Sequence, residues 1–167
     1  PSEELTANAR AEMFALFARY YADTTPDRFE ADLDAKHRVV LLQDQAGVIR
    51  GFSTLAIECM FIAGSPLRIV FSGDTIIDRP FWGSQPFAFA WIREIGRIAA
   101  CAPNEPLYWL LIVKGHRTYR YLSAFGLDFV PNWRGSDCPR LTKLKHAIAI
   151  ARFGKHYDAP TGLVRYE

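Results

Sequence analysis

A short polar stretch between a strand-like run and a helix-like run has the residue types best suited to ligand chemistry. Residues 67–71 are largely apolar, residues 72–75 read Ser-Gly-Asp-Thr, and residues 87–100 have helical periodicity. A turn that opens a helix presents unpaired backbone N–H groups and the positive end of the helix dipole. We therefore expect an anionic, phosphate-bearing ligand near Gly83. Arg79 and Arg117 precede expected helices and either reach its phosphates or are solvated surface residues.

Four side chains are candidates for proton transfer or for binding a polar substrate. Asp74 lies between the strand and the helix, where it serves as a base or an amine-binding group, or caps a turn. Glu58 interrupts an apolar strand segment and faces either the same cleft or solvent on an edge strand. His116 stands at a strand-to-helix turn, where it transfers protons or caps the helix. Tyr121 either donates a proton or packs with its hydroxyl in water.

Composition and charge argue against several classes of function. The chain has 167 residues, of which 50% are hydrophobic and 23% charged, as expected for one globular domain over residues 1–167. A net charge of +2 argues against a nucleic-acid partner, and the lack of an eighteen-residue apolar run argues against a membrane span. Cys59, Cys101 and Cys138 are odd in number and far apart, which favours reduced thiols in a cytoplasmic protein. No histidine has zinc-ligand spacing with another histidine or cysteine, so we expect no metal.

The elements that must position these residues follow from periodicity and turn signals. We expect helices over residues 4–21, 27–36, 87–101, 118–125 and 140–153. We expect strands over residues 38–44, 48–60, 67–71, 107–113 and 127–130, with a terminal strand or a tail over 163–166. Hairpin-linked strands come first and crossovers later. This order predicts an α/β fold of the α+β type, with a mixed sheet, antiparallel early and parallel late, and helices on both faces.

Three features in this order resemble the GNAT superfamily of N-acetyltransferases over roughly residues 4–130. The first is the hairpin of residues 38–60, which has Gly51 and Phe52 near the start of its second strand. The second is the strand, the Trp-Gly-Ser-Gln loop of residues 82–85 and the helix, where the family has its pyrophosphate loop. The third is residues 116–127, which resemble the family's late helix with its closing glycine at Gly126.

The resemblance implies an N-acyltransferase that moves an acetyl or larger acyl group directly from acyl-CoA to a small-molecule amine. The catalytic candidates are then Asp74, Glu58, His116 and Tyr121. Trp82 either packs the loop down or contacts the adenine or the acyl chain. The implied acyl-CoA contacts are the end of the strand and the loop after it: Thr75, Ile76, Ile77, Arg79, Trp82, Gly83, Ser84 and Gln85.

Departures from the family pattern keep two further hypotheses open. Gln85 stands where the loop has a glycine or alanine, Pro86 removes the next N–H donor, and Leu122 stands where the late helix has a tyrosine. These residues favour a GNAT-like domain that binds a small ligand without catalysis. The other hypothesis is transfer of the acyl group from an acidic carrier protein that binds at the last helix. Without such a partner, the basic residues of this helix form a solvated face. The last helix and the terminal strand would also suit a homodimer interface. The basic residues are Arg140, Lys143, Lys145, Arg152 and Lys155.

Overall fold

The computed structural model describes residues 1–113, 115–135 and 138–165, and its first part is built on a four-stranded sheet of order β1-β2-β3-β4. The chain divides into two compact units, residues 1–60 with 66–111 and residues 61–65 with 112–167. The prediction of one domain over residues 1–167 stays a prediction. The first unit contains, apart from the turn-side ends of β2 and β3 at residues 61–62 and 65, the elements η1 (Ser2–Glu4), α1 (Ala7–Ala18), α2 (Pro26–Asp34), β1 (Arg38–Gln43), β2 (Ile49–Ile62), β3 (Ser65–Ile77), η2 (Arg79–Phe81), α3 (Gln85–Ala100) and β4 (Leu107–Leu111).

The sheet is mixed, as the sequence predicts. β1 pairs antiparallel with β2, from Arg38 opposite Leu55 onward. β2 and β3 are neighbours joined by a two-residue turn, a connection that only antiparallel strands allow. β3 then pairs parallel with β4, and the chain reaches β4 through the crossover helix α3. The prediction of an early antiparallel and a late parallel part is confirmed.

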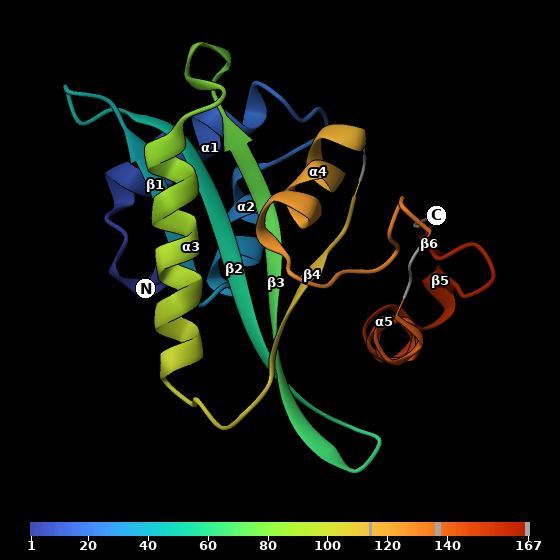
Figure 1. Ribbon diagram of the computed structural model, residues 1–167. Coiled ribbons are helices and arrows are strands. Elements are labelled where there is room, and N and C mark those ends of the chain that lie inside the picture. The colour runs from blue at the N-terminus through green and yellow to red at the C-terminus, as the bar shows by residue number, and fades with distance from the viewer. Residues whose placement is uncertain (114, 136–137, 166–167) are drawn as a thin grey trace. The chain divides into compact units, whose positions relative to one another are not determined.

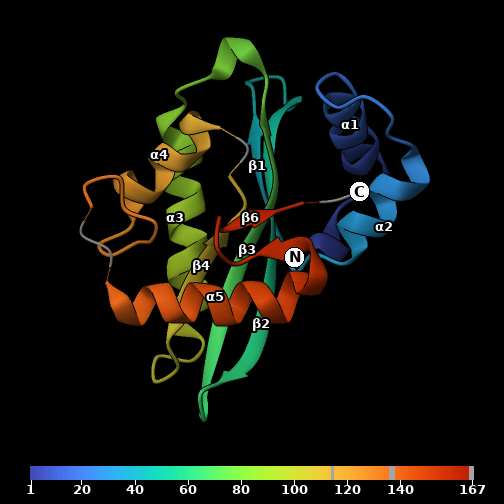
Figure 2. The same ribbon diagram turned by 90° about the vertical axis from the view of Figure 1, so that its right-hand side faces the viewer.

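Two apolar clusters cover the two faces of this sheet. Figure 2 views the sheet nearly edge-on, with α3 on one face and α1 and α2 on the other. On the α1 and α2 face, buried side chains such as Leu16 and Leu33 pack around Phe52, which is fully buried. On the α3 face, Trp91 packs with Leu55 and Val70, and its ring centroid lies 4.6 Å from that of Trp109. The polar groups of the strands are therefore held between two dry layers.

The strand that leads to the site is longer than the sequence predicts. The polar residues 72–75 favour a turn, yet β3 continues without a break to Ile77 (Figure 1). Gly51 explains part of this, because a Cβ there would lie 2.9 Å from the Ile76 carbonyl oxygen and would push β3 away from β2. The expected end of the strand at residue 71 is wrong because β2 supplies backbone partners over this stretch.

The second unit contains α4 (His116–Phe125), α5 (Pro139–Phe153), η3 (Gly154–His156) and the short strands β5 (Tyr157–Asp158) and β6 (Leu163–Val164). β5 and β6 pair antiparallel, so the expected terminal strand exists over two residues. The expected strand over residues 127–130 is wrong, because these residues form bends and Leu127 is fully exposed. Lys114, in the expected turn before α4, and Tyr166 lie outside the described residues. Within the described residues, no helix combines the length and the apolar character that crossing a membrane requires.

Candidate functional site

The sheet opens where β4 ends and β3 continues. The parallel pairing runs from Arg68 opposite Leu107 to Ser72 opposite Leu111. Beyond this point, residues 73–77 of β3 have no β4 partner among the described residues, and Figure 1 shows β3 running on past β4. We call the backbone of residues 73–77 the open edge of β3. An unpaired strand edge presents N–H and C=O groups that can bind a ligand with amide groups of its own.

An extra residue at Asp74 lies at the start of this open edge. Residues 63 and 64 form a two-residue turn, which places Ile62 of β2 opposite Ser65 of β3. Near this turn, the numbers of two residues that face each other therefore add up to 127. Further along, the Asp78 N–H donates to the Arg50 carbonyl at 2.8 Å, and those numbers sum to 128. β3 therefore has one residue more than β2 between these points, which defines a β-bulge.

Side-chain contacts locate that extra residue. A Cβ on Gly73 would lie 2.6 Å from the Thr54 hydroxyl oxygen and 2.8 Å from Cε of Lys36, which follows α2. The Ser53 hydroxyl, by contrast, lies 2.8 Å from that of Thr75. The register thus changes between Gly73 and Thr75, and Asp74 is the residue in between. Asp74 is a half-buried strand residue, so the interpretation of it as a turn cap is wrong.

Tyr21 is a candidate site residue that the sequence analysis does not identify. It follows α1, is half-buried, and stacks on Phe17 with ring centroids 4.6 Å apart. Burial raises the pKa of the Tyr21 hydroxyl, and the negative charge of Asp74 raises it further. Both effects act in the same direction, so the phenol keeps its proton well above neutral pH. The only signal in the sequence is a tyrosine at the end of the first amphipathic helix, which is more often a packing residue.

The loop from Asp78 to Ser84, which we call the helix-entry loop, connects the open edge to α3. Gly83 has φ of +81°, a conformation that favours glycine, and a Cβ there would meet no atom within 4 Å. Ser84 is the N-cap residue of α3 but its side chain makes no capping hydrogen bond, and the first turn of the helix has no acidic residue. The exposed Gln85 and then Pro86 begin the helix. This end of α3 therefore has the electrostatic character of an anion site, with one N–H fewer because of Pro86.

Side-chain contacts hold the helix-entry loop against α1 and β3. The Tyr20 hydroxyl donates to the Asp78 carboxylate at 2.9 Å and accepts from the Arg79 N–H at 3.2 Å. Arg19 lies 3.4 Å from the same carboxylate. The exposed Arg79 guanidinium lies 5.9 Å from the Trp82 ring centroid. The loop is thus fixed from the α1 side, and it carries a cation at Arg79 and a positive-φ residue at Gly83.

The other end of α3 is held by Arg68, a buried residue of β3. Its guanidinium donates to the carbonyls of Ile98 at 2.7 Å, Ala99 at 3.2 Å and Ala102 at 2.6 Å. These carbonyls lie at or just after the last turn of α3, where helical partners run out and the dipole is negative. Arg68 therefore anchors α3 on β3 and helps fix where its first turn lies.

The remaining predicted catalytic residues are placed away from Asp74 or in the other unit. Glu58 is half-buried on β2, opposite Ile69 by the hairpin register, and so about 17 Å along the strand from Asp74. His116 begins α4 and is exposed, and Tyr121 stacks on Phe125 with ring centroids 6.0 Å apart. Both belong to the second unit. The Arg117 side chain lies outside what the structure describes. The catalytic roles of Glu58, His116 and Tyr121 stay predictions.

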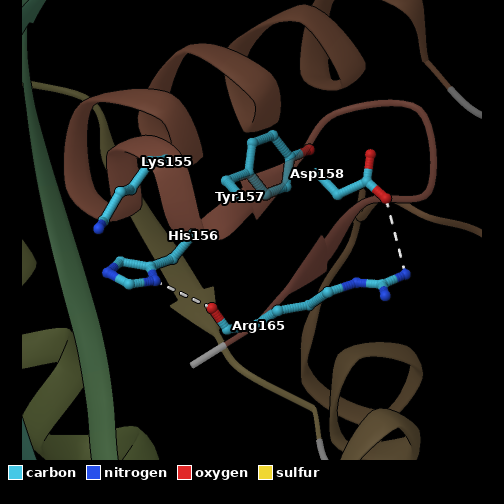
Figure 3. Close-up of a pocket in the computed structure, with 5 residues that line it drawn as sticks. All are labelled: Lys155, His156, Tyr157, Asp158 and Arg165. Carbon is cyan, nitrogen blue, oxygen red and sulfur yellow. Dashed lines mark hydrogen bonds and ion pairs between the residues drawn. The ribbon is translucent and has the colours of Figure 1, made fainter. Parts of the chain in front are cut away.

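The second unit contains a cavity of about 270 Å³, lined by Lys155, His156, Tyr157, Asp158 and Arg165 (Figure 3). Its charged groups are largely engaged with one another. Arg165 lies 3.7 Å from the Asp158 carboxylate, and the Arg165 carbonyl is 3.0 Å from Nδ1 of His156. The Tyr157 hydroxyl is hydrogen-bonded to His146 at 2.6 Å. In the described part of the chain, no three metal-ligating side chains are grouped to hold an ion.

The fold of this chain is similar to that of known proteins, although its sequence is not. No family model and no curated protein matches the chain. Among solved structures, glucosamine-6-phosphate N-acetyltransferase from Arabidopsis thaliana is 12% identical, with a TM-score of 0.54 over 74% of this chain and 89% of that one. Ribosomal-protein-alanine N-acetyltransferase from Brucella melitensis biovar Abortus is 17% identical, with a TM-score of 0.56 over 77% and 92%. AAC(6')-Iy in complex with a bisubstrate analogue containing CoA is 17% identical, with a TM-score of 0.57 over 77% and 90%. The fold of this chain is the GNAT acetyltransferase fold.

Proposed function

We propose that this chain, which has the GNAT fold, is an N-acyltransferase that transfers an acyl group from acyl-CoA to a small-molecule amine. The observation that carries the proposal is the open edge of β3, which the helix-entry loop connects to the uncapped first turn of α3. One ligand with an amide-containing arm and a pyrophosphate matches both features. The CoA-containing analogue bound to a structural neighbour is a ligand of this kind.

The residues of the helix-entry loop would hold the phosphate end of the donor. Gly83 leaves room for a close approach, and the first turn of α3 offers N–H groups and the positive end of its dipole. Arg79 adds a cation on the same loop. The backbone of Thr75, Ile76 and Ile77 would bind the arm that carries the acyl thioester.

Asp74 and Tyr21 are suited to the acceptor. Asp74 would bind the amine or take its proton, since a carboxylate on the sheet attracts an ammonium group. The amine nitrogen forms a bond to the thioester carbon, the carbon–sulfur bond breaks, and the proton lost by nitrogen ends on the departing thiolate. A tyrosine hydroxyl is neutral at neutral pH, and burial and the Asp74 charge raise the pKa of Tyr21 further, so Tyr21 has a proton that it can donate to that thiolate.

Binding and transfer are tested separately. Acetyl-CoA and longer acyl-CoAs should raise the thermal stability of the protein, because a ligand of the native state stabilises it. Release of free CoA with a panel of small amines should be detectable in the wild type and fall at least about 100-fold in Asp74→Asn, the loss typical of a missing general base. Glu3→Gln is the matched control, because it also replaces a carboxylate by an amide, at an exposed residue that is far from Asp74 in the sequence. No stabilisation by any acyl-CoA would refute the proposal, and transfer unaltered in Asp74→Asn would refute the role of that residue.

A second donor is favoured by the charge distribution along the chain. Residues 112–167 contain ten Lys or Arg and four Asp or Glu, whereas residues 1–111 contain ten and fourteen. Arg140 and Lys143 at the start of α5 and Lys155 after it are exposed. A basic surface suits an acidic carrier protein that presents the acyl group on a phosphopantetheine arm. The rate of acyl transfer from such a carrier should fall steeply between about 50 and about 300 mM salt. A Lys143→Glu variant should transfer more slowly from the carrier and at an unchanged rate from acyl-CoA.

A further inference from the structure

The Trp82 side chain occupies a backbone acceptor on the open edge of β3. Its indole N–H donates to the Ile77 carbonyl at 2.7 Å. The direction of that carbonyl follows from its own peptide unit. The Asp78 N–H donates to Arg50 of β2, and the two groups of a trans peptide point in opposite directions. The Ile77 carbonyl therefore points away from β2, toward the side that β4 has left.

This hydrogen bond satisfies a group that would otherwise be an unpaired edge carbonyl. Ile77 is half-buried, and the indole ring beside it is about half exposed at 53%. At this exposure the ring is not part of a core, and the Arg79 guanidinium of the same loop lies 5.9 Å from its centroid. An indole N–H can only donate, so while it is bonded to Ile77 it competes with any other donor for that oxygen.

We propose that Trp82 lowers the affinity for acyl-CoA by competing with the donor arm for the Ile77 carbonyl. This inference rests on the proposed function. An amide N–H of the arm, added along the open edge as a further strand, needs the acceptor that the indole holds. The indole moves away when the arm binds. Because its hydrogen bond to Ile77 must first break, the dissociation constant for acyl-CoA is higher than it would be without the indole N–H.

The test replaces Trp82 with phenylalanine, which keeps a ring for Arg79 and removes the N–H. Trp82→Phe should bind CoA about two- to tenfold more tightly than the wild type, the effect of one net hydrogen bond. ADP carries the pyrophosphate without the amide arm, so its affinity should not change. Trp133→Phe is the matched control, because Trp133 is also exposed, at 67%, and lies under Arg134 at 5.1 Å.

Isothermal titration calorimetry with CoA and ADP separates the outcomes. If neither wild type nor variant binds CoA, the proposed function fails. If both bind CoA and Trp82→Phe binds it equally or more weakly, the competition proposed for Trp82 is wrong. An equal gain for ADP also overturns it, since the effect would then come from the loop and not from the Ile77 carbonyl. Circular dichroism confirms that each variant is folded.

The intrinsic fluorescence gives an independent readout. Displacement of the indole from Ile77 should change the tryptophan emission when CoA binds, because an exposed ring loses its hydrogen-bond partner. That change should be present in Trp133→Phe and absent in Trp82→Phe. A change of equal size in both variants would contradict movement of Trp82.

Discussion

Replacing Arg68 with methionine should destabilise the protein by about 3 kcal/mol. The substitution removes three hydrogen bonds from a charged donor to the carbonyls of Ile98, Ala99 and Ala102. Each such bond contributes roughly 1.5–3 kcal/mol, or about 4–9 kcal/mol for three. Methionine fills a similar space and removes the cost of burying a guanidinium, which is several kcal/mol. Subtracting that burial cost from the hydrogen-bond contribution leaves a net loss of about 3 kcal/mol.

Urea unfolding followed by circular dichroism measures this loss directly, and the melting temperature should fall by roughly 6–12 °C for a chain of this size. Arg97→Met is the matched control on the same helix. Arg97 is 70% exposed and, within the described residues, its ion pair is with Glu94 at 3.3 Å, so its removal should cost at most about 1 kcal/mol. If Arg68→Met is no less stable than Arg97→Met, the guanidinium does not anchor α3, and the reasoning from burial and carbonyl geometry is refuted.

Two further predictions concern the open edge and its neighbours. Gly73→Ala should cost about 1–3 kcal/mol, because the added Cβ would lie 2.6 Å from the Thr54 hydroxyl oxygen; Gly96→Ala, in open space within α3, should instead stabilise by up to about 1 kcal/mol in the same urea assay. Asp74→Asn should lower the pKa of Tyr21, measured by phenolate absorbance against a Tyr21→Phe reference, because a charge that raises it is removed. The stability that the neutral Tyr21 hydroxyl contributes is present below its ordinary pKa of 10.0 and is lost as pH rises through the raised value. An unchanged Tyr21 titration in Asp74→Asn would show that the two groups do not interact.

The sheet could be predicted from the sequence because its strands carry local signals. Apolar runs on either side of a polar turn that begins at Asp44 identify β1 and β2, and the structure holds that turn with hydrogen bonds from Ala46 and Val48 to the Asp44 carboxylate. The hydrogen bond from Arg50 is the largest cause that lowers the pKa of Asp44. The parallel strand β4 is recognisable as an apolar run after a helix. In each case the residues that decide the element lie within it or beside it.

The site could be predicted only in part, because its decisive contacts join residues far apart in the chain. Ser72, Gly73 and Asp74 are turn formers locally, and only pairing with β2 keeps them in a strand. Part of the rise in the pKa of Tyr21 comes from Asp74, 53 positions later in the chain. Arg68 had a visible signal, a charged residue in an apolar strand run, but its carbonyl partners belong to a helix end about thirty residues away.

The unusual helix-entry loop also shifts where a donor would gain its binding energy. Pro86 removes one N–H from the first turn of α3, and Gln85 adds a side chain where the backbone should approach a phosphate. The pyrophosphate of the proposed donor would therefore meet fewer N–H groups than a glycine-rich loop supplies. The open edge of β3 has the opposite character, since β3 runs on for five residues beyond its last described pairing with β4. A donor arm bound there adds backbone hydrogen bonds that do not depend on the loop sequence. The competition at Ile77 follows from the same geometry, because an edge that is free to bind an arm is also free to bind the nearest indole of its own chain.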